Sequence, residues 1–291
     1  MLRPSIPSPG TALRQQFAQG IVVLPGVFNG ISALSATKAG AQALYISGAG
    51  VTNAYLGVPD IALASLNEFA AQAAAITQVS PVPVIADADT GFGEAWNVVR
   101  TVLEMERAGL AGIHLEDQVS PKRCGHLDGK AVIASEQMQE KIAAAVSAKR
   151  DPNFVIIART DARGVEGLDA AIARANQYVE AGADAIFPEG LTSTEEFKTF
   201  RAQVKAPLLA NMTEFGKTPL ISVAKFEEMG YEMVIFPMTA FRVMLKALDE
   251  SYALLIEHGT QAGFLDRMRT RAELYATLDY PQYESETYRV G

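Results

Sequence analysis

The sequence predicts an α/β protein of the (β/α)8 barrel type, in which eight parallel strands alternate with helices. Eight short apolar runs recur along the chain, and each is followed by a stretch with helical periodicity. The runs are almost continuously hydrophobic, which is typical of parallel strands buried on both faces. Eight alternations favour a closed barrel over an open doubly wound sheet, which has no reason to stop at eight strands.

The expected strands occupy residues 21–24, 43–47, 82–86, 112–115, 154–158, 185–187, 207–210 and 233–236. In the helix expected between the third and fourth strands, Val98, Val102 and Met105 form one apolar stripe, and Gly109 should end that helix. Ser135 is the expected N-cap of the helix that runs to Ala148.

A long helix at about residues 240–257 should follow the last strand, with apolar side chains at positions 241, 244, 245, 248, 252 and 255. A helical segment at 263–278 and an irregular tail at 279–291 are expected after it. The apolar face of the helix at 240–257 is larger than the area that one outer helix of a barrel buries. This excess predicts that the helix contacts another molecule. Because no linker divides the chain, residues 1–291 should form a single barrel domain with a C-terminal helical extension at about 258–291.

Composition narrows the class of protein. A net charge of -8 argues against nucleic acid or an anionic membrane as a partner. The first ten residues have no apolar signal core, and no apolar run approaches the ~18 residues of a membrane span. The single cysteine cannot form an internal disulfide, which suits a reducing cytoplasm. A cytoplasmic protein that binds neither nucleic acid nor membrane is therefore expected.

The segment after the fourth strand concentrates reactive side chains. It holds the only cysteine, Cys124, together with Lys122, Arg123 and His126. Neighbouring cations favour the thiolate, and Gly125 allows a ligand to approach the main chain. A lone cysteine is usually a small buried hydrophobe. These neighbours instead favour a chemical role.

Polar or ionisable residues follow each strand from the second to the eighth. Barrel enzymes place their active sites at these strand ends. One such residue can cap a helix or pair with an arginine, but packing does not explain the whole set. The set includes Tyr45, Ser47, Asp87, Asp89, Glu116, Asp117, Arg159, Asp161, Glu189, Asn211 and Arg242.

Asp87 and Asp89 stand two residues apart, so on a regular strand they would face the same side. Two like charges together need a cation between them, and oxygen ligands suit Mg²⁺ or Mn²⁺. The alternative is a solvated pair at the start of a helix. The sequence has no paired-cysteine or paired-histidine zinc motif, so zinc is not expected.

The run of residues 122–126 resembles the signature of the isocitrate lyase and phosphoenolpyruvate mutase superfamily, in its cysteine-bearing lyase branch. The resemblance extends from about residue 9 to residue 283. It implies that Asp87 and Asp89 hold Mg²⁺, or Mn²⁺, with Glu116 and Asp117 reached through water. It also implies Tyr45 as the base and Cys124 as the general acid. The substrate-binding positions that it implies are Ser47, Gly48, Ala49, Asp60, Gly125, His126, Arg159, Glu189, Asn211, Met212, Thr213, Arg242 and Arg271.

The implied reaction is a reverse Claisen-type cleavage of a small di- or tricarboxylate. The expected substrate is 2-methylisocitrate, split into pyruvate and succinate in the methylcitrate cycle of propionate catabolism. Isocitrate lyase, 2,3-dimethylmalate lyase and oxaloacetate hydrolase activities are alternatives, whereas Cys124 argues against phosphonopyruvate chemistry. A non-catalytic barrel used as a binding protein is the alternative from another class. It would be expected to have lost the aspartate pair or the cysteine.

The resemblance also carries an expectation about assembly. It implies that the helix after the eighth strand is swapped between neighbouring barrels, and that swapped dimers pair into a homotetramer. Such a swap would bring Arg271 near an active site.

Overall fold

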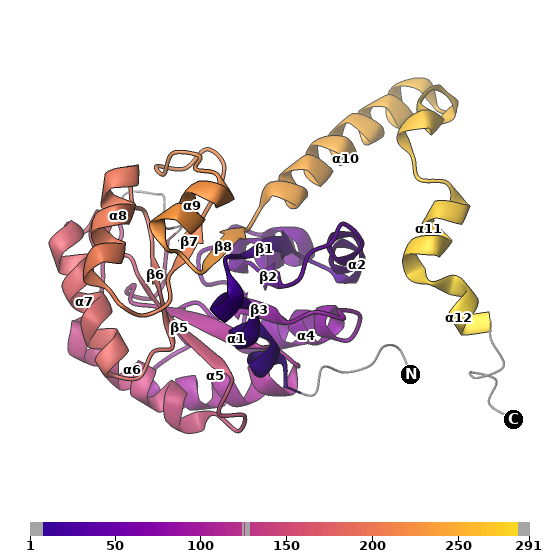
Figure 1. The fold of residues 1–291 in the computed structure, drawn as a ribbon. Coiled ribbons are helices and arrows are strands. Elements are labelled where there is room, and N and C mark those ends of the chain that lie inside the picture. Colours follow the sequence, from indigo (N-terminus) through magenta and orange to yellow (C-terminus); the bar gives the residue numbers. More distant parts are fainter. Residues whose placement is uncertain (1–7, 124, 126–128, 285–291) are drawn as a thin grey trace, which may run out of the picture.

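The computed structural model describes residues 8–123, 125 and 129–284. Its sheet has the strand order β6-β5-β4-β3-β2-β1-β8-β7, all parallel, and a bridge between Ile186 and Leu208 joins its two ends (Figure 1). The predicted barrel is confirmed, with strand boundaries shifted by a few residues. The strands are β1 (Val22–Val27), β2 (Leu44–Ile46), β3 (Val84–Asp87), β4 (Gly112–Glu116), β5 (Val155–Thr160), β6 (Ala185–Pro188), β7 (Leu209–Asn211) and β8 (Met233–Phe236).

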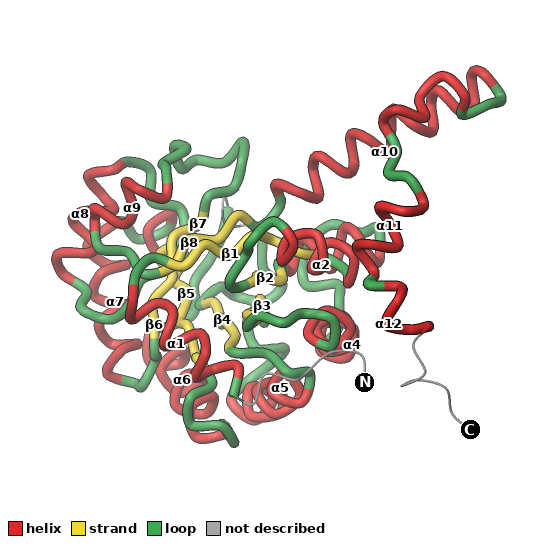
Figure 2. Tube along the Cα trace, turned by 45° about the vertical axis from the view of Figure 1, so that its right-hand side comes forward, coloured by secondary structure: helices red, strands yellow, loops and turns green. Residues whose placement is uncertain are grey.

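Helices surround the strands on the outside (Figure 2). Ser135 is the first residue of α6 and not its N-cap, which is Ala134. A short helix α3 (Gly48–Val51) and a π-helical turn at Thr52–Leu56 follow β2 directly. The surrounding helices are α2 (Gly30–Lys38), α4 (Leu66–Thr77), α5 (Ala95–Arg107), α6 (Ser135–Ala148), α7 (Leu168–Glu180), α8 (Thr194–Gln203) and α9 (Val223–Met229).

The core has two layers, one between strands and helices and one inside the barrel. The inner layer includes Leu13 of α1 (Pro9–Gln19), which is fully buried, with Phe17 packed against it. This helix closes the amino end of the barrel, and the sequence did not predict it. Arg14 fixes α1 to the strand layer by donating to the carbonyl oxygen of Asn153 and pairing with Asp184.

After β8, helix α10 (Thr239–His258) runs away from the barrel (Figures 1 and 2). Its first turn is anchored, because Phe241 packs against Phe28 and Met238. Farther along, the apolar stripe is uncovered, with Leu248 38% and Tyr252 63% exposed. The barrel of the same chain therefore does not cover this face.

The chain beyond α10 differs from the expectation. A 3-10 segment at Ala262–Arg267 and α11 (Arg271–Leu278) replace one helix at 263–278, because Met268 is extended and interrupts it. The tail is not irregular throughout, since α12 (Tyr280–Glu284) is helical. Lys38 of α2 donates a hydrogen bond to the carbonyl oxygen of Ala276, so α11 packs back on its own barrel. Across the described ranges, no helix combines the length and the apolarity that a membrane crossing requires.

Candidate active site

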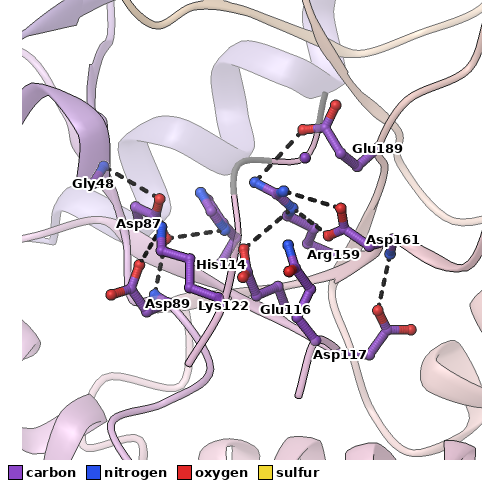
Figure 3. A network of polar contacts seen from close by, with 12 residues as sticks. Gly48, Asp87, Asp89, His114, Glu116, Asp117, Lys122, Arg159, Asp161 and Glu189 are labelled. Atoms are coloured by element: carbon purple, nitrogen blue, oxygen red, sulfur yellow. Dashed lines mark hydrogen bonds and ion pairs between the residues drawn. The ribbon is translucent and has the colours of Figure 1, made fainter. Parts of the chain in front are cut away.

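The carboxyl ends of β2 to β6 bring a group of ionisable side chains together (Figure 3). On β4, Ile113 and Leu115 pack into the outer core layer, so the alternate residues His114 and Glu116 point into the barrel. Both are fully buried. Neighbouring strands supply Asp87 from β3 and Arg159 from β5.

The two aspartates after β3 lie together beside β2. The Gly48 amide donates to Asp87 Oδ2 at 3.2 Å, and the Asp89 amide donates to Asp87 Oδ1 at 2.8 Å. Asp89 has a φ of 46°, so the chain turns left-handed there and does not continue as a strand. A Cβ added at Gly48 would lie 2.7 Å from Asp87 Oδ2 and 3.3 Å from Asp89 Oδ1. Only glycine fits at this position.

A buried lysine neutralises part of this negative charge. Lys122 Nζ lies 2.8 Å from Asp60 Oδ1 and 2.7 Å from Asp89 Oδ1, and the lysine is 3% exposed. Burial raises the pKa of Asp89 to about 7; Lys122 opposes this effect, whereas Asp87 and Asp60 add to it. Burial also raises the pKa of Glu116 well above its usual value, against the pull of Arg159. The carboxylates therefore outnumber the cations that could keep them ionised.

The residues present fit a hard divalent cation. Both carboxylate oxygens of Glu116 are buried and accept no hydrogen bond, while Asp60 Oδ1 and Asp89 Oδ1 are buried beside the Lys122 ammonium. Oxygen donors with free lone pairs suit Mg²⁺ or Mn²⁺. Within the described residues, no group of three acidic, histidine or cysteine side chains is arranged to hold a metal ion by itself. Water and substrate would have to supply the remaining ligands, as is usual for Mg²⁺.

Tyr45 and His114 form a buried pair below the aspartates. The Tyr45 hydroxyl lies 2.8 Å from His114 Nε2, and His114 Nδ1 lies 3.7 Å from Asp87 Oδ1. Burial, reinforced by Asp87, raises the pKa of Tyr45 well above its usual value. Burial lowers the pKa of His114 to about 4, so the imidazole is neutral near pH 7. A neutral imidazole beside a phenol can accept a hydrogen bond from the phenol hydroxyl.

Arg159 occupies the other half of the site. It donates from Nε to Asp161 Oδ2 at 2.8 Å, and it lies 3.4 Å from Glu116 and 3.5 Å from Glu189. Its guanidinium stands over the Phe187 ring, 5.1 Å from the centroid. The arginine is thus held by three carboxylates and one ring, with 8% of its surface exposed.

Asp117 faces away from the aspartate pair (Figure 3). Its carboxylate accepts hydrogen bonds from the Thr160 hydroxyl at 2.7 Å, the Tyr178 hydroxyl at 2.8 Å and the Asp161 amide at 2.9 Å. These contacts lie on the helix side of β4, because Asp117 alternates with Glu116. The structure therefore does not bring Asp117 to the carboxylates expected to hold a metal. It supports the β5 segment from behind instead.

The other residues that the sequence predicted for substrate binding lie in different surroundings. Ser47 and Gly48 are buried at the start of α3, and Ala49 packs against the cluster around Phe28. Asn211 donates to Glu189 Oε2 at 3.1 Å. Met212 is buried in the outer core layer, and Thr213 is buried beside it in sequence.

Arg242 lies 3.2 Å from Glu214 Oε2 and stacks over Phe215. Arg271 begins α11, which lies beside α2 on the outside of the barrel (Figure 1). Cys124 and His126 lie outside the described residues. Gly125 is described, and a Cβ added there would meet Glu189 Cγ at 2.5 Å and Arg159 Nη2 at 2.6 Å.

Two residues of this group, His114 and Lys130, are not predicted by the sequence. His114 sits two residues before Glu116, so the alternation of a strand could have placed it on the same face. Lys130 pairs with Asp161 across 31 positions of sequence, and no local pattern signals such a contact.

Comparison with known proteins gives the family. A protein-family model described as phosphoenolpyruvate phosphomutase matches residues 13–256. The chain belongs to the phosphoenolpyruvate phosphomutase family. It is 55% identical over 292 residues to a 2-methylisocitrate lyase of Aeropyrum pernix, covering 100% of this chain and 94% of the relative. The superfamily inferred from residues 122–126 is confirmed.

Solved structures of this superfamily are similar as well. A 2,3-dimethylmalate lyase, described as a member of the phosphoenolpyruvate mutase and isocitrate lyase superfamily, superimposes with a TM-score of 0.90 at 38% identity, covering 97% of this chain and 94% of that one. A phosphonopyruvate hydrolase in complex with oxalate and Mg²⁺ superimposes with a TM-score of 0.88 at 29% identity, covering 98% of this chain and 100% of that one. Family members thus share this barrel while their names record different reactions.

Proposed function

We propose that the protein is a carbon–carbon lyase that cleaves 2-methylisocitrate to pyruvate and succinate and requires Mg²⁺, with Mn²⁺ as a substitute. The observation that carries the proposal is one buried rim in which Asp87, Asp89 and Glu116 adjoin Arg159. Carboxylates with unused lone pairs suit a cation, and the arginine suits a carboxylate substrate. The 55% identity to a 2-methylisocitrate lyase supports the choice of substrate.

The side chains have distinct roles in this reaction. Asp87 and Asp89 would hold the cation, with Glu116 reached through water. The bound cation supplies a Lewis acid that lowers the pKa of the substrate hydroxyl. Tyr45 would take the hydroxyl proton in its phenolate form, which the charge of a bound cation would favour against the burial that raises its pKa. His114 Nε2, 2.8 Å from the Tyr45 oxygen, would hold that oxygen in place.

Bond cleavage between C2 and C3 of the substrate releases pyruvate and leaves the two electrons of that bond on the succinate fragment. Arg159 offsets the charge that develops on its carboxylates, with Arg242 as a second cation. Cys124 then donates a proton to the carbanionic carbon as the general acid. Gly48 keeps the main chain close to Asp87, where a side chain would collide with the carboxylate.

A product assay tests the proposal. Purified protein is incubated with 2-methylisocitrate or isocitrate, with and without chelator, and pyruvate and glyoxylate are measured. We expect pyruvate from 2-methylisocitrate and little product in excess chelator. One methyl group in an apolar pocket is worth about 1–3 kcal/mol, so slower release of glyoxylate from isocitrate is expected too.

The other outcomes of this assay identify the alternatives. An equal or higher kcat/KM for isocitrate would reverse the substrate assignment. If the protein cleaves 2,3-dimethylmalate or hydrolyses oxaloacetate and not 2-methylisocitrate, it has the activity of another member of the superfamily. No turnover of any of the four acids would favour a barrel that binds without catalysis.

We also infer a homotetramer of helix-swapped dimers. The uncovered face of α10 needs a partner, and a groove of about 990 Å³ between α1, β1 and α2 offers one. Ile21, Val23, Ile31 and Ala36 line this groove, and Met244 of α10 lies at its edge. The α10 of a second copy would fill it and would carry Arg271 toward a neighbouring barrel. Sedimentation at micromolar concentration should give a tetramer, and an active monomer would refute the swap.

The lone cysteine leads us to infer a cytoplasmic location.

A further inference from the structure

A buried lysine, Lys130, links the segment after β4 to the strand that carries Arg159. Lys130 Nζ donates to Asp161 Oδ1 at 2.7 Å and also to the carbonyl oxygen of Gly125. The side chains of Lys130 and Asp161 are 5% and 0% exposed. Removing an ammonium and a carboxylate from water costs several kcal/mol per ion, so a buried pair is a poor source of net stability. A pair kept at that cost points to a positioning role.

Asp161 is shared between two cations. Arg159 donates to it from Nε at 2.8 Å and from Nη2 at 3.2 Å (Figure 3), while Lys130 approaches the Oδ1 that Nη2 also reaches. The Asp161 amide is in turn fixed by Asp117. The Asp161 carboxylate is therefore held in place. How strongly it attracts one of the two cations depends on whether the other cation is present.

The main chain at Gly125 contacts both Lys130 and the Arg159–Glu189 pair. The absent side chain at Gly125 leaves its main chain against Arg159 Nη2 and Glu189, where a Cβ would be only 2.6 Å and 2.5 Å away. Lys130 holds the carbonyl of the same residue. The main chain at Gly125 and the side chains of Arg159 and Lys130 are thus held together around the Asp161 carboxylate.

We propose that Lys130 is a positioning residue of the lyase reaction, which ties the main chain at Gly125 to the Arg159–Asp161 pair. This role rests on the proposed function and requires no contact between Lys130 and substrate. Without the ammonium, the Gly125 carbonyl loses its donor and the whole negative charge of Asp161 falls to Arg159. Arg159 is then drawn toward Asp161 and away from the substrate carboxylate. The main chain at Gly125, which has lost its donor, is free to move away from Arg159.

The chain contains a matched control. At the opposite end of the barrel, Asp184 is likewise shared by a lysine and an arginine, Lys149 at 3.2 Å and Arg14 at 2.6 Å. Lys149 is nearly as buried, with 10% of its side chain exposed. Lys149→Met removes a similar ion pair and leaves the active site untouched.

The experiment compares Lys130→Met, Lys130→Arg and Lys149→Met in the full-length protein. We expect Lys130→Met to lower kcat/KM for 2-methylisocitrate by at least about tenfold, which corresponds to about 1.4 kcal/mol of transition-state stabilisation. Lys130→Arg, which keeps the charge, should recover most of that loss. Lys149→Met should keep wild-type kinetics while lowering the melting temperature about as much as Lys130→Met.

A second readout needs no substrate. Amide hydrogen exchange of the peptide covering residues 119–133 should be faster in Lys130→Met than in wild type and unchanged in Lys149→Met. Wild-type kcat/KM and wild-type exchange in Lys130→Met would overturn the proposal, as would equal activity losses in the two methionine variants. If Lys130→Met does not fold, Lys130→Gln carries the same comparison. If the wild-type protein cleaves no substrate, the proposed function fails, and the exchange measurement still decides whether Lys130 holds the segment.

Discussion

The two ends of the barrel use the same ionic arrangement in different surroundings. At the carboxyl end, Asp161 lies between Arg159 and Lys130, and at the amino end Asp184 lies between Arg14 and Lys149. The amino end is closed by α1, whose apolar face enters the inner core layer. The carboxyl end carries further buried carboxylates, among them Glu116, whose two oxygens accept no hydrogen bond.

The difference separates structural charges from functional ones. Across the described parts of the chain, the buried carboxylate oxygens that accept no hydrogen bond belong to Asp60, Asp89 and Glu116, all at the carboxyl end. A buried polar atom without a partner costs about 1–3 kcal/mol. For buried carboxylates the fold accepts this cost at the carboxyl end, where a cation and a substrate would satisfy the atoms. The amino end should therefore govern stability, and the carboxyl end activity.

The largest effect is expected from Asp87→Asn. The amide keeps the shape of the side chain and removes the charge that holds a cation, so kcat/KM should fall by at least about 10³-fold, or about 4 kcal/mol. Burial raises the pKa of Asp87, but the surrounding cationic groups lower it overall to about 2, so removing this charge should also lower the free energy of unfolding. Steady-state kinetics and thermal melts check both statements. Near-normal turnover in this variant would contradict the assignment of the metal site.

Leu13→Ala tests the amino end. Leu13 is 0% exposed in the inner core layer, and such truncations cost about 2–5 kcal/mol of unfolding free energy. Denaturant unfolding should show this loss, while kcat/KM at a temperature where the variant is folded should match wild type. Leu13→Met, which nearly conserves volume, is the control and should cost less than about 1.5 kcal/mol. A kinetic defect as large as the stability defect would break the division between the two ends.

Cys124→Ser tests the carboxyl end at a residue assigned from the sequence alone. A hydroxyl is a far weaker acid than a thiol, so loss of the positioned acid should lower kcat by about 10²-fold or more. Binding of pyruvate or succinate, measured by calorimetry, should persist. A serine variant with wild-type kcat would show that another group protonates the carbanion.

The smallest predicted effect concerns Lys122. Its ammonium lies against Asp60 and Asp89, so it competes by charge with a divalent cation at these carboxylates. In Lys122→Met the affinity for Mn²⁺, measured by electron paramagnetic resonance without substrate, should rise about tenfold, or about 1.4 kcal/mol. Lys149→Met, at the amino end, should leave the affinity unchanged. Weaker Mn²⁺ binding in Lys122→Met would mean that the lysine helps to form the metal site.

The sequence by itself determined the barrel and the end of it at which ionisable side chains gather. Buried parallel strands must be apolar on both faces, so eight such runs are visible without a structure. Ionisable residues directly after them cannot belong to the core, which is why Asp87, Asp89, Glu116 and Arg159 could be named. The broad apolar stripe of α10 was equally visible, because helical periodicity is local.

Only the tertiary structure decided which of these residues meet. Adjacent residues such as Glu116 and Asp117 look equivalent in sequence, yet the pleat turns one into the barrel and the other toward Tyr178. A strand that is apolar on both faces gives no local sign of which face is inside. His114 could be placed only by its spacing from Glu116, since a single histidine in an apolar strand does not itself mark the inner face. Lys130 contacts Asp161 because its long side chain extends across a loop. Helix α1 closes the barrel through contacts with residues that are distant in the sequence, such as Asn153. Such contacts depend on how the ends of neighbouring strands are spaced, and that spacing exists only once the barrel has closed.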